Sequence, residues 1–185
     1  MDLTQETIDR LAIQHYPSPV LHDKSSDIGD INDSVRSLAE KMISLMHVNN
    51  GVGLSAPQIG ISSRMFVTSQ VAGQGDLVFI NPFFSSLSKK MKRDNEGCLS
   101  LPGITVEVNR HQKVTIKALN LDGEEFELEA EDLSARILQH EHNHLDGALI
   151  VDKMSFMDKI ANKRTLRFLE SEHHRRMRKL ATASG

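Results

Sequence analysis

The spacing of apolar residues changes once and abruptly, near residue 131 of this 185-residue chain. Residues 113–119 (KVTIKAL) and 124–130 (EEFELEA) alternate between polar and apolar side chains on either side of the turn sequence NLDG. Alternation with a period of two around a short turn predicts a β-hairpin with one apolar face. Residues 131–147 instead have helical spacing, and a glycine ends the segment. The sequence therefore predicts a hairpin that leads directly into a helix.

The predicted helix carries polar residues on its apolar face. That face comprises Leu133, Ile137, His140, Glu141, His144 and Leu145. His140 and His144 lie one helical turn apart, so their imidazoles can bind one metal ion. Glu141 lies on the same side and can reach water bound to that ion, which is the chemistry of the His-Glu-x-x-His motif. His142 points about 200° away from His140, so we expect it at the surface or in a secondary contact. A metal would also provide the partners that buried polar groups need.

A catalytic metal site typically has three protein ligands, and the histidines supply only two of them. The position at which metzincins place a third histidine is Ile150, and Glu170 and Glu172 lie in a strongly basic segment that we expect at the surface. Cys98 is the only cysteine and lies in the turn-rich sequence NEGCLSLPG, where backbone can approach a ligand closely. A Cys-His-His set suits zinc or ferrous iron, whereas a lone cysteine is more often a small buried apolar residue. Both interpretations of Cys98 stay open from the residues alone.

The other periodic segments indicate an α+β protein. Residues 33–49 have the spacing of an amphipathic helix with an asparagine or aspartate cap, and residues 156–180 form a further helical segment. Short strands are expected at 64–69 and 77–80. The order of helix, strands and helix predicts mainly antiparallel sheets around a central metal-binding helix. Since no repeat or long linker divides the chain, we expect one domain that spans residues 1–185.

Composition limits the class of protein. Hydrophobic residues at 39% and charged residues at 25% are ordinary for a soluble globular protein. The polar, acidic start lacks the features of a secretory signal, and no apolar run approaches the ~20 residues of a membrane helix. A single cysteine allows no internal disulfide and fits a reducing compartment. We therefore expect a cytoplasmic protein without a membrane partner, with an organelle as the alternative in a eukaryote.

Charge is distributed unevenly, although the net charge is only −3. Residues 159–180 contain eight Lys or Arg and two Glu. The plainer interpretation, which we favour, is a solvated amphipathic helix that packs its apolar residues in part, namely Ile160, Leu166, Phe168 and Leu169. The functional hypothesis is electrostatic attachment to ribosomal RNA, close to emerging chains. The sequence contains no motif for reading bases, so no DNA partner is expected.

Three segments resemble the motifs of the peptide deformylase family in order and in spacing: GVGLSAPQ at 51–58, EGCLS at 96–100 and QHEHNH at 139–144. The likeness extends from the segment HYPSPVLHDKSSDI to the end of the last motif helix. The resemblance implies a hydrolase that removes the formyl group from the formyl-methionine of newly synthesised proteins. It also implies one divalent metal ion, ferrous iron in the cell, with zinc, nickel or cobalt as alternatives.

The family's functional residues fall on particular residues of this chain. The family's metal ligands fall on Cys98, His140 and His144, and its general acid and base falls on Glu141. The oxyanion donors fall on the Gln58 amide and the Leu99 backbone N–H, and the substrate contacts fall on Gly53 and Val52. In that arrangement, metal-activated water attacks the formyl carbonyl, and Glu141 transfers the proton of the water to the leaving amine. The formyl peptide would lie as an added strand along the backbone near Gly53.

The chain departs from the family pattern in its third motif. Asn143 stands where the motif usually has Asp, and we expect Arg110 to keep a hydrogen bond with it but to lose an ion pair. Ser55 stands where many bacterial members have Ala. Two other functions stay open: a metallopeptidase that recruits a downstream glutamate, and a deformylase-like protein that binds formyl peptides without turnover. A cysteine ligand favours the deformylase over the peptidase, and the presence of every residue that the chemistry requires favours an enzyme.

Overall fold

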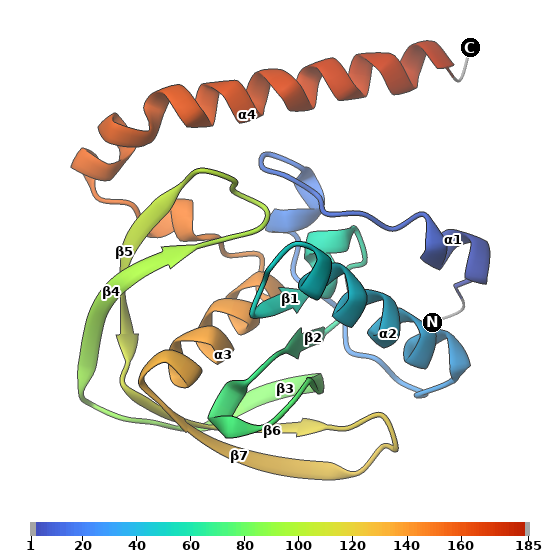
Figure 1. Ribbon diagram of the computed structural model, residues 1–185, viewed down its shortest axis with the longest axis vertical. Coiled ribbons are helices and arrows are strands. Elements are labelled where there is room, and N and C mark those ends of the chain that lie inside the picture. Colours follow the sequence, from blue (N-terminus) through green and yellow to red (C-terminus); the bar gives the residue numbers. More distant parts are fainter. Residues whose placement is uncertain (1–2, 184–185) are drawn as a thin grey trace.

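The computed structural model describes residues 3–183. The helices are α1 (Gln5–Asp9), α2 (Asp33–Val48), α3 (Asp132–Leu145) and α4 (Phe156–Ala183), with short 3-10 helices at Pro19–His22, Ala56–Ile59, Val71–Gly73 and Ile150–Lys153. The strands are β1 (Gly53–Ser55), β2 (Met65–Thr68), β3 (Leu77–Leu87), β4 (Met91–Gly97), β5 (Thr105–His111), β6 (Lys113–Leu119) and β7 (Glu125–Glu131). Figure 1 shows α3 between the pair β4 and β5 and the other strands. The predicted α+β fold, with antiparallel sheets around a central helix, is confirmed.

Five strands form one antiparallel sheet in the order β1-β2-β3-β6-β7, and β4 pairs with β5 in a second sheet. The hairpin predicted around NLDG is β6 and β7, with Ile116 opposite Leu128 and Val114 opposite Ala130. These four side chains are buried in one cluster with residues of α3. Because β1 lies at the end of the strand order, one of its edges is unpaired.

The sequence does not predict the hairpin of β4 and β5. Every residue of β4 except Glu96 is exposed, so the strand lacks the alternation by which a half-buried strand is recognised. In β5 the alternate residues Val106 and Val108 are buried. The two strands pair residue for residue, from Met91 opposite His111 onward. The position of β4 is therefore determined by its pairing with β5 and not by an alternation of polar and apolar residues in its own sequence.

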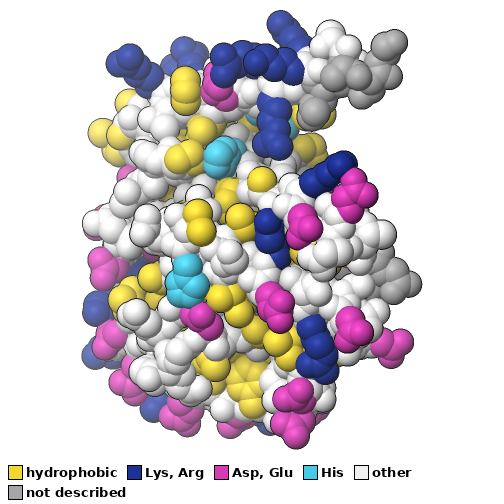
Figure 2. Space-filling model, turned by 45° about the vertical axis from the view of Figure 1, so that its right-hand side comes forward, with side chains coloured by type: hydrophobic (Ala, Val, Ile, Leu, Met, Phe, Trp, Pro, Cys, Tyr) yellow, Lys and Arg dark blue, Asp and Glu magenta, His cyan; other side chains and the backbone are white. Residues whose placement is uncertain are grey.

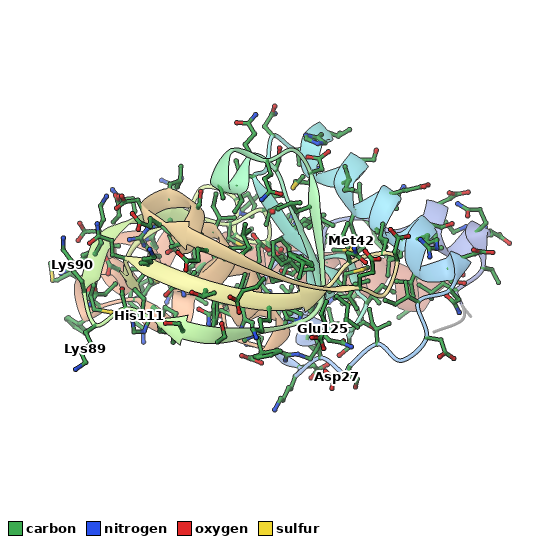
Figure 3. All side chains as sticks on the ribbon, turned by 90° about the horizontal axis from the view of Figure 1, so that it is seen from below. Asp27, Met42, Lys89, Lys90, His111 and Glu125 are labelled. Carbon is green, nitrogen blue, oxygen red and sulfur yellow. The ribbon has the colours of Figure 1, made fainter. Side chains whose placement is uncertain are left out.

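The helix predicted at 33–49 is confirmed as α2. The Asn32 side chain caps it by accepting a hydrogen bond from the Val35 N–H at 3.2 Å. Leu38 and Met42 are fully buried, and Figure 3 shows Met42 directed from α2 toward the strands. Burial of each such side chain contributes roughly 1.5–3 kcal/mol. Since α2 contacts β1, this packing holds β1 in place beside α3.

The helix predicted from residue 131 is confirmed as α3. Leu138 belongs to a buried cluster that also includes Phe66 of β2. The predicted burial of Leu133 is wrong, because this residue is 67% exposed in the first turn of α3 and borders the cavity described below. Gly147 ends the helix with a φ of +72°, and a Cβ atom there would overlap the carbonyl oxygen of His22.

The predicted C-terminal helix is confirmed as α4, which runs along one side of the molecule (Figure 1). Leu169 is buried and Leu166 is half-buried, as expected. Ile160 and Phe168, which were expected to pack in part, are 53% and 60% exposed. Ile160 precedes Leu169 by nine residues and therefore points to the opposite side of the helix. No helix within residues 3–183 has the length and apolar character needed to cross a membrane.

Candidate active site

Three side chains that can bind a metal converge from two parts of the chain. Cys98 follows β4, whereas His140 and His144 project from successive turns of α3. The Nε2 atom of His144 lies 3.4 Å from the Cys98 sulfur and 3.3 Å from Nε2 of His140. Tetrahedral bonds of about 2.0–2.3 Å to one ion require ligand separations of roughly 3.3–3.7 Å. The donor atoms therefore fit a single divalent metal ion.

A buried glutamate that the sequence prediction missed, Glu96, supports this group. Its Oε2 atom lies 2.9 Å from Nδ1 of His140, so that Nε2 of the imidazole faces the other two donors. Arg110 donates to both Glu96 oxygens at 2.8 Å, and Arg136 donates to Oε1 at 2.7 Å. Burial opposes ionisation of Glu96, but the hydrogen bonds from Arg110 and His140 outweigh it and hold the pKa of this carboxyl well below its usual range. The only sequence signal for this role is its place inside the EGCLS motif.

The two histidines differ in the metal-free protein. Burial opposes protonation of His140, but its contacts with Cys98 and Glu96 outweigh burial and raise its pKa to about 10. Burial lowers the pKa of His144 well below its ordinary value, and the neighbouring His140 lowers it further. Nδ1 of His144 is buried and has no hydrogen-bond partner within residues 3–183, in contrast to Nδ1 of His140. A metal ion must therefore displace a proton from His140 when it binds.

Arg110 also donates to Oδ1 of Asn143, which confirms the expected contact between these residues. Arg110 nevertheless has an ion pair, because Glu96 supplies the carboxylate that Asn143 lacks. His142 lies in a secondary contact, with Nε2 at 3.2 Å from Nη2 of Arg64 and Nδ1 at 3.3 Å from the Asp146 carboxylate. It is therefore separate from the metal-ligand group, as its position on the helix predicts.

Glu141 and Gln58 are both held by β1. The Ser55 hydroxyl lies 2.6 Å from Oε2 of Glu141, and burial raises the pKa of the Glu141 carboxyl. The Ser55 backbone N–H donates to Oε1 of Gln58 at 2.9 Å. Nε2 of Gln58 donates to the Ser100 hydroxyl at 3.3 Å and to the Cys98 sulfur at 3.4 Å. These partners orient the amide N–H groups of Gln58 toward the metal-ligand group.

A cavity of about 540 Å³ opens beside this group. It is lined by Val52, Gly53, Gln58, Cys98, His140 and Glu141, and also by Leu99. Of the site residues predicted from the sequence, only His144 does not border it, because His144 is buried next to His140. The backbone N–H of Leu99 makes no hydrogen bond to another residue of the described chain. The structure thus brings together every residue to which the sequence analysis assigned a role in the site.

Comparison with known proteins identifies the family and the fold. The family model for polypeptide deformylase matches residues 10–160. Peptide deformylase 1 of Clostridium perfringens is 48% identical over 133 residues, which cover 72% of this chain and 90% of the relative. A crystal structure of Arabidopsis thaliana peptide deformylase 1B matches with a TM-score of 0.83 and 36% identity, over 89% of this chain and 92% of that one. The Thermotoga maritima peptide deformylase matches with a TM-score of 0.75 and 38% identity, over 78% and 97% of the two chains. These matches do not favour the metallopeptidase or the binding protein without turnover, and the chain therefore belongs to the peptide deformylase family, whose members are metal-dependent hydrolases of N-formyl peptides.

Proposed function

We propose that this deformylase removes the formyl group from N-terminal formyl-methionine with the aid of one divalent metal ion held by Cys98, His140 and His144. The observation that supports this most directly is the convergence of these three donors beside Glu141 at the wall of a cavity. A thiolate with two neutral imidazoles suits ferrous iron or zinc, and ferrous iron is the ion that we propose for the cell, with zinc, nickel or cobalt as alternatives. When bound, such an ion lowers the pKa of its water, to about 7 in favourable zinc sites, and polarises a carbonyl group.

Glu141 is the proposed general base and acid. Burial raises the pKa of its carboxyl, although the charge of His140 and a hydrogen bond from Ser55 act in the opposite direction. A carboxyl whose pKa is raised toward neutrality can both accept a proton and release it again. Glu141 would take the proton of the attacking water and deliver it to the leaving amine. The products are formate and a peptide with a free amino terminus.

The Gln58 amide and the Leu99 backbone N–H are the proposed oxyanion donors. Ser55 and Ser100 hold the Gln58 amide in one orientation, so it need not reorganise during the reaction. Loss of one preorganised donor of this kind typically costs on the order of 10²–10³ in rate. The formyl peptide would pair with the free edge of β1 and contact Gly53 and Val52.

We also propose that α4 associates with ribosomal RNA. Figure 2 shows Lys and Arg side chains gathered along this helix, and the eight basic residues between 159 and 180 are all exposed. Exposed cations that contact phosphates give an affinity that falls steeply with salt. Removal of residues 163–185 should therefore abolish salt-sensitive co-sedimentation with ribosomes, and unchanged co-sedimentation would contradict the proposal. Because ribosomes are the proposed partner, we also propose a cytoplasmic location. We further propose that residues 1–185 form a single catalytic domain.

The test of the enzymatic proposal is formate release from the peptide formyl-Met-Ala-Ser. The protein is purified without oxygen and loaded with ferrous iron. We expect turnover by the wild-type protein and none by Glu141→Ala, which should still bind the metal. Cys98→Ser should lose metal and activity together. A Cys98→Ser variant with unchanged metal content and activity would refute the ligand assignment.

A further inference from the structure

Two residues of β1 face the side chain of Glu141. Gly53 and Ser55 are two positions apart in a strand, so they lie on the same face. β1 contacts α3, and Glu141 of α3 is only 4% exposed. The carboxylate therefore lies between the strand and the helix at the wall of the cavity, where these neighbours restrict its position.

Gly53 provides the space for this carboxylate. A Cβ atom at residue 53 would lie 2.7 Å from Cδ and 2.8 Å from Cγ of Glu141, and it would overlap Oε1. Carbon atoms in favourable contact are about 3.5–4.0 Å apart. Any side chain at residue 53 would therefore displace the Glu141 carboxylate from its present position.

Ser55 binds the same carboxylate. Its hydroxyl lies 2.6 Å from Oε2 of Glu141 and 2.9 Å from the Glu141 backbone carbonyl. The hydroxyl has one proton, and the shorter distance and the negative charge favour its donation to Oε2. Ser55 is fully buried, so bulk water cannot replace this bond. The other oxygen, Oε1, has no hydrogen-bond partner within residues 3–183 and is left for the reacting water.

On the basis of the proposed role of Glu141, we infer that Gly53 and Ser55 together position the catalytic carboxylate. Gly53 leaves room for the carboxylate because it has no side chain. The Ser55 hydroxyl binds Oε2, so that Oε1 is the oxygen that exchanges protons. Ser55 is a positioning residue, since it acts through Glu141. Gly53 gains a role that differs from the substrate contact expected from the sequence. The same Ser55 backbone N–H also orients Gln58, so one residue of β1 aligns the proton carrier with an oxyanion donor.

The test separates kcat from KM in iron-loaded variants with formyl-Met-Ala-Ser. Ser55→Ala should lower kcat by at least about tenfold, the lower end of the factor expected for one lost hydrogen bond to a charged group, and should change KM by less than about twofold. Ser55→Thr retains the hydroxyl and should retain most of the kcat. Gly53→Ala should lower kcat by more than about 100-fold because the carboxylate is misplaced. If Gly53 served only as a substrate contact, the same variant would instead raise KM with kcat retained.

Ser25→Ala is the matched control. Ser25 is also buried, at 4% exposure, but its hydroxyl has no partner within residues 3–183. This variant should keep the wild-type kcat and KM. Equal kcat values for Ser55→Ala and Ser25→Ala would overturn the role of Ser55. The proposed function would still stand after such equal values, provided that the wild-type protein releases formate and Glu141→Ala does not.

A double-mutant cycle tests the contact without turnover. In metal-free protein, Ser55→Ala should lower the urea midpoint, and the shift should be much smaller in a Glu141→Ala background, where the acceptor carboxylate is absent. Equal shifts in the two backgrounds would show that the hydroxyl and the carboxylate do not interact, and would overturn the inference. This measurement stays decisive even if the wild-type protein releases no formate.

Discussion

Glu96→Gln perturbs the charge network behind the metal-ligand group without changing its shape. Glu96 is 6% exposed and pairs with Arg110, Arg136 and His140 at 2.7–2.9 Å. Glutamine replaces one acceptor oxygen by an NH2 group, which would then face an N–H donor of Arg110, Arg136 or His140. The change also removes the carboxylate that neutralises two guanidinium groups that are themselves nearly buried.

The expected loss in the free energy of unfolding follows from the burial of the Glu96 ion pairs. Removal of one partner from a buried ion pair typically costs ~3–5 kcal/mol, a large part of a total stability of ~5–15 kcal/mol. We expect this decrease in the free energy of unfolding of metal-free Glu96→Gln, measured by urea denaturation at neutral pH. Glu107→Gln is the control, because Glu107 pairs with Arg93 at 2.9 Å but the two side chains are 51% and 63% exposed. It should cost at most ~1 kcal/mol, and a difference between the variants below that value would refute the reasoning.

The pH dependence of this difference is a second check. The pKa of Glu96 is held below its ordinary value of 4.5 in the folded protein. Its ionised form therefore stabilises the fold above about pH 4.5, and that stabilisation is lost as the pH falls toward the folded-state pKa. The gap in stability between wild type and Glu96→Gln should narrow below this pH. A gap that does not narrow in acid would contradict the assignment of an ionised carboxylate.

Three further predictions concern the site and the core. Asn143→Asp adds a carboxylate beside Arg110, which already has one, so activity in the formate assay should change by less than about tenfold; a thousandfold rise would show that Asn143 limits the enzyme. Because the pKa of His140 is raised to about 10 in the metal-free protein, metal binding near neutral pH should release its proton, and metal affinity should rise with pH. Calorimetry in buffers of different ionisation enthalpy measures this release, and affinity independent of pH would contradict it. Leu38→Ala should lower the free energy of unfolding by ~2–5 kcal/mol because Leu38 is fully buried, whereas Leu133→Ala, at a 67% exposed position, should change it by less than ~0.5 kcal/mol in the same urea assay.

The elements that the sequence predicts well are those whose signals are local. The helix α2, the hairpin of β6 and β7 and the helix α3 follow from apolar periodicity and turn residues, which reflect interactions between residues a few positions apart. The same periodicity places His140, Glu141 and His144 on one face of α3. It does not report what covers that face, so it predicted burial for Leu133, which borders the cavity instead.

The sequence by itself predicted the residues to which we assign the chemistry, through three short motifs and their order. Only the tertiary structure decided how those residues act together. Cys98 lies 46 residues before His144, yet their ligand atoms are 3.4 Å apart. The support from Glu96, and the two residues of β1 that hold Glu141, likewise come from segments far from α3 in the chain. Contacts between distant segments depend on how β1, β4 and α3 pack, and packing leaves no periodic signal in the sequence of any one of them.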